Sequence, residues 1–497
     1  MLRLLVITCF LRSVQSICPT ECVCSLDEKG RRQVICSKGG MVVPLPIAMI
    51  DPAVEVLKIT APEDFQNSLT IGPIFQQFSR LEEIHVVKSN VPAIGKHSFW
   101  GVSNLKVLNL SHNNISQVLE SNFRGLAQLT ELYLDDNRIE SMHSGTFRHL
   151  PELRVLSIAR NRITKLAPRQ FLSLAKLHHL DLSWNALEEL TPDVFKDVQE
   201  MKVFSCRGCS LQSINTYLYR LLASLTHLDL GDNQFKYISK DEFQDLKKLQ
   251  VLHLDGNQLP VVLEGTFSQE KTPHLQVLNL SRNRLAKVTA TAFANQSSLM
   301  ELNLGYNKLS RLETASFYPL ADSLKVLEIS GNNFVVSELK HILQILVKLK
   351  ELSIADISLG KGDIPLGLFV YLEHLKFLNI SGNHLMHFPA QVLAPVPKLN
   401  ELDISRNSFQ GLDDRILNRI ESIPVLHLGR NPWTCDYCHI SSMLDRVNRS
   451  ADISNVLCAM PYSVSGMTLG SLKRSSLEWC HNGLDYNEDG VAGLSLA

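Results

Sequence analysis

The sequence lacks the patterns by which most enzymes, nucleic-acid-binding proteins and membrane-spanning proteins are recognised. Its 49 Lys and Arg nearly balance 50 Asp and Glu, so the net charge of −1 offers no overall attraction to nucleic acid or an anionic bilayer. No run approaches the roughly 18 apolar residues that cross a bilayer. No G-x-S-x-G, H-E-x-x-H or phosphate-binding glycine loop is present. We therefore expect neither an enzyme nor a cofactor, and a partner other than nucleic acid or membrane.

The N-terminus carries a targeting signal. Arg3 precedes the apolar run from Leu4 to Leu11, and Val14 and Ser16 are small residues at the two positions that signal cleavage requires. We predict a secretory signal peptide over residues 1–16 and a protein secreted to the extracellular space. Cys9 leaves with the signal, so ten of the 11 cysteines remain in the mature chain.

Eight of those cysteines form two groups of four near the ends of the chain. The groups are Cys18, Cys22, Cys24 and Cys36, and Cys435, Cys438, Cys458 and Cys480. In an oxidising compartment such groups indicate disulfides. Zinc is the rival interpretation, since Cys435 and Cys438 are spaced C-x2-C, but the second pair of that group is not closely spaced. The sequence therefore favours a disulfide framework at each end.

Between the cysteine groups the sequence repeats with a period of about 24 residues. The segments LKVLNLSHNNI from Leu105, LTELYLDDNRI from Leu129 and LRVLSIARNRI from Leu153 share the pattern L-x-x-L-x-L-x-x-N-x-L. Sixteen repeats begin at Val54, Leu81, Leu105, Leu129, Leu153, Leu177, Met201, Leu225, Leu249, Leu275, Leu299, Leu324, Leu349, Leu375, Leu399 and Ile423. Because one repeat cannot bury its own apolar edge, neighbours must stack into a solenoid.

Each repeat predicts one turn of that solenoid. The alternation over its first six residues is typical of a short strand with leucines pointing inward. The Asn at the ninth position turns the chain, and its amide bonds neighbouring backbone inside the stack. An aromatic residue eighteen positions after the first Leu predicts a second buried column, made of Phe99, Phe123, Phe147, Phe171, Phe195, Tyr219, Phe243, Phe267, Phe293 and Phe317.

These features resemble the extracellular leucine-rich repeat superfamily in its 24-residue form, as in Toll-type ectodomains, Slit-like proteins and the acid-labile subunit of growth-factor complexes. The resemblance rests on the repeats, on the N-terminal spacing C-x3-C-x-C-x11-C and on the motif Asn431-Pro432-Trp433-Thr434-Cys435. It implies an α/β solenoid, a horseshoe with a parallel concave sheet and disulfide-bonded caps. The implied divisions are an N-cap at 17–53, repeats at 54–430, a C-cap at 431–480 and a disordered tail at 481–497.

The same resemblance implies how the cap cysteines pair. The family joins the first cysteine of a cap to the third and the second to the fourth. The implied bonds are therefore Cys18–Cys24, Cys22–Cys36, Cys435–Cys458 and Cys438–Cys480. The C-cap departs from the family pattern, because C-x2-C stands where C-x-C is usual, and this puts the pairing there in doubt.

Three places break the regularity. Cys206 and Cys209 take inward positions in the repeat from Met201, where two buried free thiols and a strained disulfide both fit. In the repeat from Leu349, Ile357 replaces the ladder Asn and Gly360–Pro365 inserts extra residues, which fits either a local bend or a protruding contact loop. The tail carries Asp485, Asn487, Asp489 and Gly490 as a calcium loop would, but Leu496 stands where a glutamate is required.

Six N-x-S sequons predict glycosylation, at Asn109, Asn114, Asn279, Asn295, Asn379 and Asn448. Asn109, Asn279 and Asn379 take the fifth repeat position, which is expected to project from the strands. A glycan there would keep protein partners off that part of the strand surface.

The third, fifth, seventh and eighth positions are expected to face solvent. In the middle of the chain they form an acidic, aromatic segment without sequons, and Trp and Tyr are frequent at binding hot spots. Its residues are Tyr133, Asp135, Asp136, His179, Asp181, Trp184, Asp229, Asp232, His253 and Asp255. A solvated sheet whose charges only keep the protein soluble fits the same pattern, and metal binding by the histidines is a minor alternative.

We therefore hypothesise a secreted glycoprotein that recognises another extracellular protein, of basic character, as a matrix component, ligand carrier, adhesion cue or signalling cue. The alternative is the ectodomain or a truncated isoform of a cell-surface receptor, including one of innate immune recognition.

Overall fold

The structure is a computed structural model that describes residues 18–42, 47–359, 364–447 and 456–480. The chain divides into two compact units, Met1–Leu225 and Thr226–Ala497, which are called the N-terminal and C-terminal units below. The predicted signal peptide, the predicted tail with its calcium-like loop, Asn448 and most of the insertion after Leu359 lie outside the described residues.

In the N-terminal unit, every predicted repeat has its strand, which begins two residues after the first residue of the repeat. β1 (Val23–Leu26) is antiparallel to β2 (Arg32–Cys36), and the strands that follow are parallel. They are β3 (Val56–Ile59), β4 (Glu83–Val86), β5 (Val107–Asn109), β6 (Glu131–Tyr133), β7 (Val155–Ser157), β8 (His179–Asp181) and β9 (Val203–Ser205). The predicted parallel solenoid is thus confirmed in this unit.

The C-terminal unit continues the same pattern. Its parallel strands are β10 (His227–Asp229), β11 (Val251–His253), β13 (Val277–Asn279), β15 (Glu301–Asn303), β16 (Val326–Glu328), β17 (Glu351–Ser353), β18 (Phe377–Asn379), β19 (Glu401–Asp403) and β20 (Val425–His427). Two short ladders are separate from them: β12 (Val261–Val262) with β14 (Lys287–Val288), and β21 (Trp433–Thr434) with β22 (Cys458–Met460).

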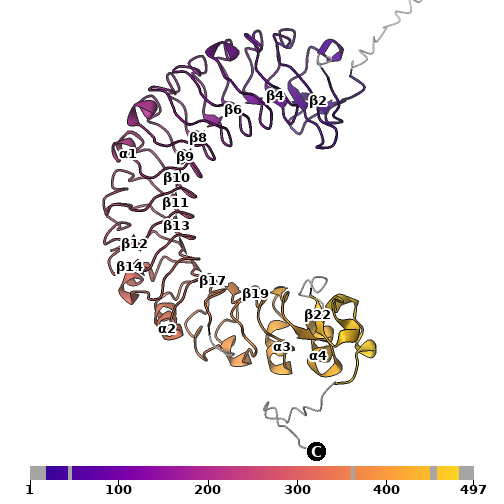
Figure 1. Ribbon diagram of the computed structural model, residues 1–497, viewed down its shortest axis with the longest axis vertical. Helices are drawn as coiled ribbons and strands as arrows, with labels where there is room; N and C mark the ends of the chain where they lie inside the picture. Colours follow the sequence, from indigo (N-terminus) through magenta and orange to yellow (C-terminus); the bar gives the residue numbers. More distant parts are fainter. Residues whose placement is uncertain (1–17, 43–46, 360–363, 448–455, 481–497) are drawn as a thin grey trace, which may run out of the picture. The chain divides into compact units, whose positions relative to one another are not determined.

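Helices lie on the side of each unit opposite the strands (Figure 1). The α-helices are α1 (Tyr217–Leu221), α2 (Val336–Ile345), α3 (Asp414–Ile420) and α4 (Tyr437–Val447). The 3-10 turns are η1 (Ile47–Met49), η2 (Glu120–Asn122), η3 (Pro192–Phe195), η4 (Thr314–Ser316), η5 (Tyr318–Leu320), η6 (Ala390–Val392), η8 (Tyr462–Val464), η9 (Leu469–Ser471) and η10 (Arg474–Ser476). α2 lies in the repeat from Leu324, and it buries Leu339, Ile342 and Leu343 at helical spacing.

Two apolar columns and one polar ladder hold the turns together. Leucines at the fourth and sixth positions, such as Leu132 and Leu134, are fully buried. The predicted aromatic column is buried throughout, with ring centroids 5.8 Å apart between Phe123 and Phe147. Because each side chain contacts its counterpart one turn away, burial continues along the stack without a single globular core.

The ninth-position asparagines form the ladder. The Oδ1 atom of Asn161 accepts the amide of Ile139 at 3.0 Å, and its Nδ2 donates to the carbonyls of Leu134, Ile158 and Ala159 at 3.0–3.1 Å. The Leu134 carbonyl also accepts from Asn137, one turn earlier. Each asparagine therefore forms hydrogen bonds with buried backbone groups of two successive turns. At this point the chain is neither helical nor in a paired strand, so these groups would otherwise be unpaired.

Disulfides close both ends. The structure joins Cys18 to Cys24, Cys22 to Cys36, Cys435 to Cys458 and Cys438 to Cys480, which are the pairs that the resemblance implies. Cys206 and Cys209 are also joined, so of the two alternatives the structure has the disulfide and not the free thiols. At the C-terminal end the fully buried Trp433 stacks on Phe409 at 6.4 Å and donates its indole N–H to the Leu428 carbonyl, which covers the last apolar turn.

Candidate binding surface

The exposed side of the strands is built from three rows of side chains. With the first residue of a repeat as position 1, positions 3 and 5 alternate with the buried leucines and lie in register from strand to strand. Tyr133, Ser157 and Asp181 are such neighbours at position 5. Parallel strands are about 4.8 Å apart, so Tyr133 and Asp181 stand about 10 Å from each other. Side chains on alternate repeats can thus contact one partner group together.

Position 8 has an unusual backbone. Its φ is positive in repeat after repeat, for example 52° at Asp136, 58° at Trp184 and 55° at Tyr306. A left-handed residue at this point turns the chain sharply out of the strand. It also carries position 7 beneath the position-8 side chains, so most position-7 residues are small and buried. The expectation that position 7 faces solvent is therefore wrong for most repeats.

In the N-terminal unit, the predicted binding residues form an N-terminal recognition surface of Tyr133, Asp135, Asp136, His179, Asp181 and Trp184. Several of its acids already have partners. Asp136 pairs with Arg160 at 2.7 Å and lies 3.6 Å from His112, and Glu131 accepts the Tyr133 hydroxyl at 2.8 Å. Burial, together with Glu131, raises the pKa of Tyr133 to about 12. This surface is less acidic than its sequence indicates, because Arg160 neutralises part of it.

Asp181 is a half-buried acid of this surface. Its carboxylate accepts the Ser183 amide at 2.9 Å and forms no ion pair with any cation of the described part of the chain. Asp135 is also half-buried, and it accepts from the Ser157 hydroxyl and the Ala159 amide. Burial raises the pKa of the Asp135 carboxyl above its ordinary value.

This burial predicts a pH effect on stability. A carboxyl with a raised pKa in the folded state loses its proton first in the unfolded chain, so folding stability falls as the pH rises from about 3.8 towards the raised value. Asp135→Asn keeps the Oδ1 acceptor and cannot ionise. We expect its stability relative to wild type to increase across that window and then stay constant, as measured by urea unfolding at a series of pH values. A difference that does not change with pH would contradict the assignment.

Trp184 is the exposed aromatic of the N-terminal recognition surface. It is 47% exposed, and its indole ring lies over Gly208, the position-8 residue of the next repeat. A Cβ atom at Gly208 would overlap that ring, and Gly208 itself has a φ of 64°. Glycine at position 208 therefore permits both the left-handed turn and the close approach of the ring. The ring lies flat against the backbone, and its outer face is in solvent.

The C-terminal unit holds the other four predicted residues. Asp255 is buried, with 2% of its surface exposed, and pairs with Arg282 at 2.7 Å, so its assignment to an exposed surface is wrong. The reason is its position 7, which lies beneath the left-handed turn. Asp232 also lies 3.5 Å from Arg282, and Asp229 accepts the Gly231 amide. His253 is half-buried, and its Nδ1 has no hydrogen-bond partner among the described residues.

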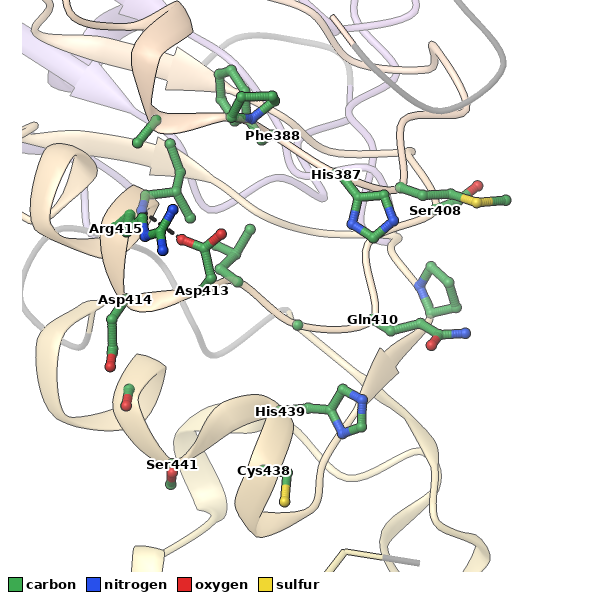
Figure 2. Close-up of a pocket in the computed structure, with 18 of the residues that line it drawn as sticks. His387, Phe388, Ser408, Gln410, Asp413, Asp414, Arg415, Cys438, His439 and Ser441 are labelled. Atoms are coloured by element: carbon green, nitrogen blue, oxygen red, sulfur yellow. Dashed lines mark hydrogen bonds between the residues drawn. The ribbon is translucent and has the colours of Figure 1, made fainter. Parts of the chain in front are cut away.

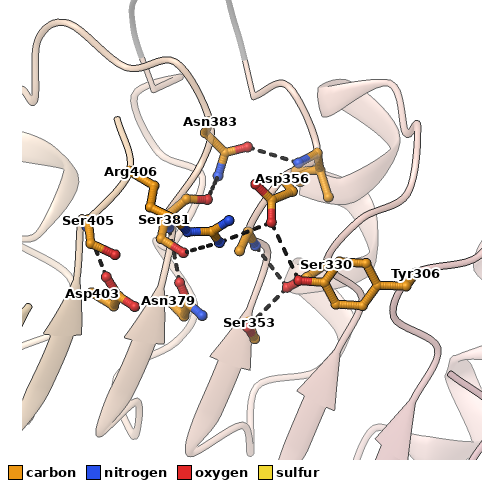
Figure 3. A network of polar contacts seen from close by, with 12 residues as sticks. Tyr306, Ser330, Ser353, Asp356, Asn379, Ser381, Asn383, Asp403, Ser405 and Arg406 are labelled. Atoms are coloured by element: carbon orange, nitrogen blue, oxygen red, sulfur yellow. Dashed lines mark hydrogen bonds and ion pairs between the residues drawn. The ribbon is translucent and has the colours of Figure 1, made fainter. Parts of the chain in front are cut away.

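A polar network that the sequence analysis missed runs along position 8 of the C-terminal unit (Figure 3). The Tyr306 hydroxyl donates to Asp356 at 3.4 Å, and Arg406 pairs with Asp356 at 3.0 Å. The side chains of Tyr306 and Asp356 reach across Gly331 and Gly382, where a Cβ would overlap them. The sequence signal that could have indicated this network is the glycine at position 8 of alternate repeats. Tyr306 is 52% exposed and is held, like Trp184, by a glycine in the next turn.

A groove of about 1040 Å³ lies between the last repeats and the C-cap (Figure 2). Met386, His387 and Trp479 are exposed along it, and His439 is fixed by Asp436 at 2.7 Å. No sequence pattern indicated this groove. Among the described residues, no three His, Cys, Asp or Glu side chains gather closely enough to hold a metal ion.

The sequon asparagines differ in their surroundings. Asn109, Asn279 and Asn379 end their strands half-buried, and each accepts the amide of the sequon serine two residues on. Asn114 donates to Asn90 at 3.0 Å, and Asn295 is exposed. Their glycosylation stays a prediction. No helix within the described ranges has the length and apolar character needed to cross a membrane.

Known proteins share this architecture. The leucine rich repeat family matches residues 79–139, 127–187, 199–259 and 273–334. Trophoblast glycoprotein of Macaca fascicularis is 30% identical over 267 residues, covering 46% of this chain and 59% of that protein. Leucine-rich repeat transmembrane protein FLRT2 of Mus musculus is 29% identical over 234 residues, covering 46% of this chain and 34% of that protein. The chain therefore covers less than two thirds of either relative.

Solved structures agree on the fold. A chain of the Drosophila Toll–Spatzle complex superposes with a TM-score of 0.58 at 17% identity, covering 92% of this chain and 75% of that chain. At this identity the likeness establishes the fold alone.

Proposed function

The chain belongs to the extracellular leucine-rich repeat superfamily, and from that premise we propose that it binds an extracellular protein partner through the exposed side of its strands. Relatives of this superfamily act in extracellular recognition and signalling, and its repeats are protein-binding modules that are generally not enzymes. One solved example of the fold is a complex of Toll with Spatzle. An open strand surface with half-exposed side chains suits contact with another protein better than it suits catalysis, which needs a dry pocket.

The observation that carries this proposal is the fixed aromatic ring of Trp184. A tryptophan that is held in one orientation loses little conformational entropy on binding, and aromatic anchors of this kind dominate interface energies. Its ring is supported by Gly208 from below and is free to accept a partner from above. If this surface were only a solvated sheet that keeps the protein soluble, its aromatic ring would not need such support.

The chemistry of the partner follows from the carboxylates that remain unneutralised. Arg160 and Arg282 form ion pairs with Asp136 and Asp255, whereas Asp181 forms none within the described chain and interacts with Arg160 only at longer range. We propose that a cationic side chain of the partner pairs with Asp181 while an apolar or cationic group covers Trp184. We therefore keep the sequence-based hypothesis of a basic partner. Its contact region is now smaller than the ten predicted residues and lies in the N-terminal unit.

Substitution in this surface tests the proposal. The intact chain would be used to capture partners from extracellular fluid, and the affinity of the identified partner would then be measured for Trp184→Ala and Asp181→Lys. We expect each variant to weaken binding at least about tenfold, which corresponds to about 1.4 kcal/mol. Trp100→Ala is the matched control, because Trp100 is 51% exposed in the same unit but follows Phe99 of the aromatic column. Equal losses from Trp184→Ala and Trp100→Ala would contradict the proposal.

We further propose that the protein is a secreted glycoprotein, as the predicted N-terminal signal, the disulfides and the sequons favour. A cell-surface receptor ectodomain is the second candidate, and it is favoured by the name of the relative FLRT2, which is a transmembrane protein. Fractionation of expressing cells into medium and membrane separates the two: the protein is expected in the medium, and recovery only with membranes supports the second candidate.

A further inference from the structure

We infer that a second surface of the C-terminal unit binds a sulfated polysaccharide through a column of lysines. This lysine ladder consists of Lys325, Lys348, Lys350, Lys376 and Lys398. It is distinct from the surface proposed above for the protein partner, and it does not depend on that proposal. Lys325, Lys350 and Lys376 immediately precede β16, β17 and β18. Lys348 and Lys398 stand three residues before β17 and β19.

The backbone places these lysines in one column. The amide of Lys350 donates to the carbonyl of Lys325 at 2.8 Å, and the amide of Lys376 donates to the carbonyl of Lys350 at 2.7 Å. The amide of Asn400 donates in turn to the carbonyl of Lys376 at 2.7 Å. The three lysines therefore take the same position, two, on successive turns about 4.8 Å apart. Lys348 and Lys398 stand two residues before that position in their own repeats, on the other side of a buried leucine.

None of the five ammonium groups has a carboxylate partner in the described chain. Four of the side chains are exposed and Lys325 is half-buried. Lys398 donates to His374 Nδ1 at 3.2 Å, and Lys325 contacts the Met300 sulfur at 3.5 Å. Acids flank the column at the next position, three, where Glu301 and Glu351 are exposed and Glu401 lies 2.9 Å from His427. Glu373 lies 3.4 Å from His374. The column itself therefore carries positive charge, with no ion pair to these acids in the described chain.

The same positions in the N-terminal unit are different. There Lys106 pairs with Glu82 at 3.0 Å, and Lys176 pairs with Glu152 at 2.6 Å. Acids as well as bases occur at these positions, such as Glu55 and Glu82, so the fold itself does not require unpaired lysines there. In the C-terminal unit no acid occupies either position between Ser323 and Asn400.

The occupant that fits is a linear polyanion. Regularly spaced cations attract a chain of regularly spaced anions and release its counterions, which gives affinity without a pocket. For a protein outside the cell with disulfide-bonded caps, the sulfate groups of a glycosaminoglycan match this requirement. Ammonium groups bind such anions as point charges, so the contact needs no fixed orientation of each lysine.

Binding to a heparin oligosaccharide tests the inference with the full-length secreted protein. The variant is Lys348→Gln/Lys350→Gln/Lys376→Gln. The control is Lys106→Gln/Arg154→Gln/Lys176→Gln, which removes three charges at equivalent positions of the N-terminal unit. Dissociation constants would be measured by fluorescence anisotropy between about 50 and 200 mM NaCl. Circular dichroism would confirm that both variants are folded.

We expect the ladder variant to bind at least about tenfold more weakly and the slope of log Kd against log salt to fall by about two. The control should stay within about twofold of wild type. Its net charge changes by the same amount as that of the ladder variant, so a difference between the two variants reports the position of the charges. Glu351→Gln should bind slightly more tightly. Equal losses in both triple variants, absence of heparin binding, or stronger binding to desulfated heparin, single-stranded DNA or phosphatidylserine vesicles would overturn the inference.

Discussion

Replacement of Asn161 by alanine should destabilise the N-terminal unit by about 3 kcal/mol. The Ile139 amide would lose its acceptor inside the stack, and an unpaired buried group costs about 1–3 kcal/mol. Three further hydrogen bonds would be lost, but the carbonyls of Leu134 and Ile158 also accept from Asn137 and Asn185. Their loss is therefore partial, and the Ile139 amide accounts for the largest single share.

Hydrogen exchange measures this effect best, because a long stack of repeats can unfold in parts. We expect faster exchange of the amides between residues 129 and 185 in the Asn161→Ala variant. Asn104→Ala is the matched control, since Asn104 is exposed and makes one hydrogen bond, to the Ser79 carbonyl. Protection that is unchanged near Asn161, or lost equally in both variants, would show that the ladder does not stabilise the turns.

Removal of the Cys435–Cys458 disulfide should have an effect of similar size. The bond closes a loop with a sequence separation of 23, for which the chain-entropy estimate is about 3.4 kcal/mol. It also fixes β22 beside β21, which carries the buried Trp433. Loss of the cap would expose the last apolar turn and the open edge of the sheet, and such edges promote aggregation.

The double variant Cys435→Ser/Cys458→Ser avoids a free thiol. We expect a lower unfolding midpoint in guanidinium chloride and a concentration-dependent increase in light scattering. Cys18→Ser/Cys24→Ser is the comparison, because its sequence separation of 6 predicts a smaller loss of about 2.2 kcal/mol. A larger loss from the N-terminal pair would mean that loop closure is not the main contribution of these bonds.

Side-chain periodicity is a local property, and for that reason it predicted most of the fold. Leucines at positions 1, 4 and 6 of each repeat specify a strand with one buried face, whatever its neighbours are. Repetition then requires stacking, since a single turn leaves its apolar edge exposed. The positions of the strands, the aromatic column and the asparagine ladder all follow from this argument, as does the need for caps.

The binding surface could not be predicted in the same way, as Asp255 and Trp184 show. Asp255 is polar and stands beside a strand, yet the left-handed residue that follows it turns its side chain beneath Arg282, a residue of the next repeat. Trp184 owes its fixed orientation to Gly208, which is also one repeat away. A pattern within one repeat contains no information on such neighbours.

The amino-acid sequence by itself determined the solenoid, the length of its turns, its buried columns and the chemistry of its ends. Only the tertiary structure decided which charges are neutralised, which aromatic rings are held, that Cys206 and Cys209 are joined, and that the lysines before β16–β19 lack counter-ions. The reason is physical: burial of leucines depends on spacing along the chain, whereas pairing of charges depends on side chains about 24 or more residues apart that meet only when the turns stack.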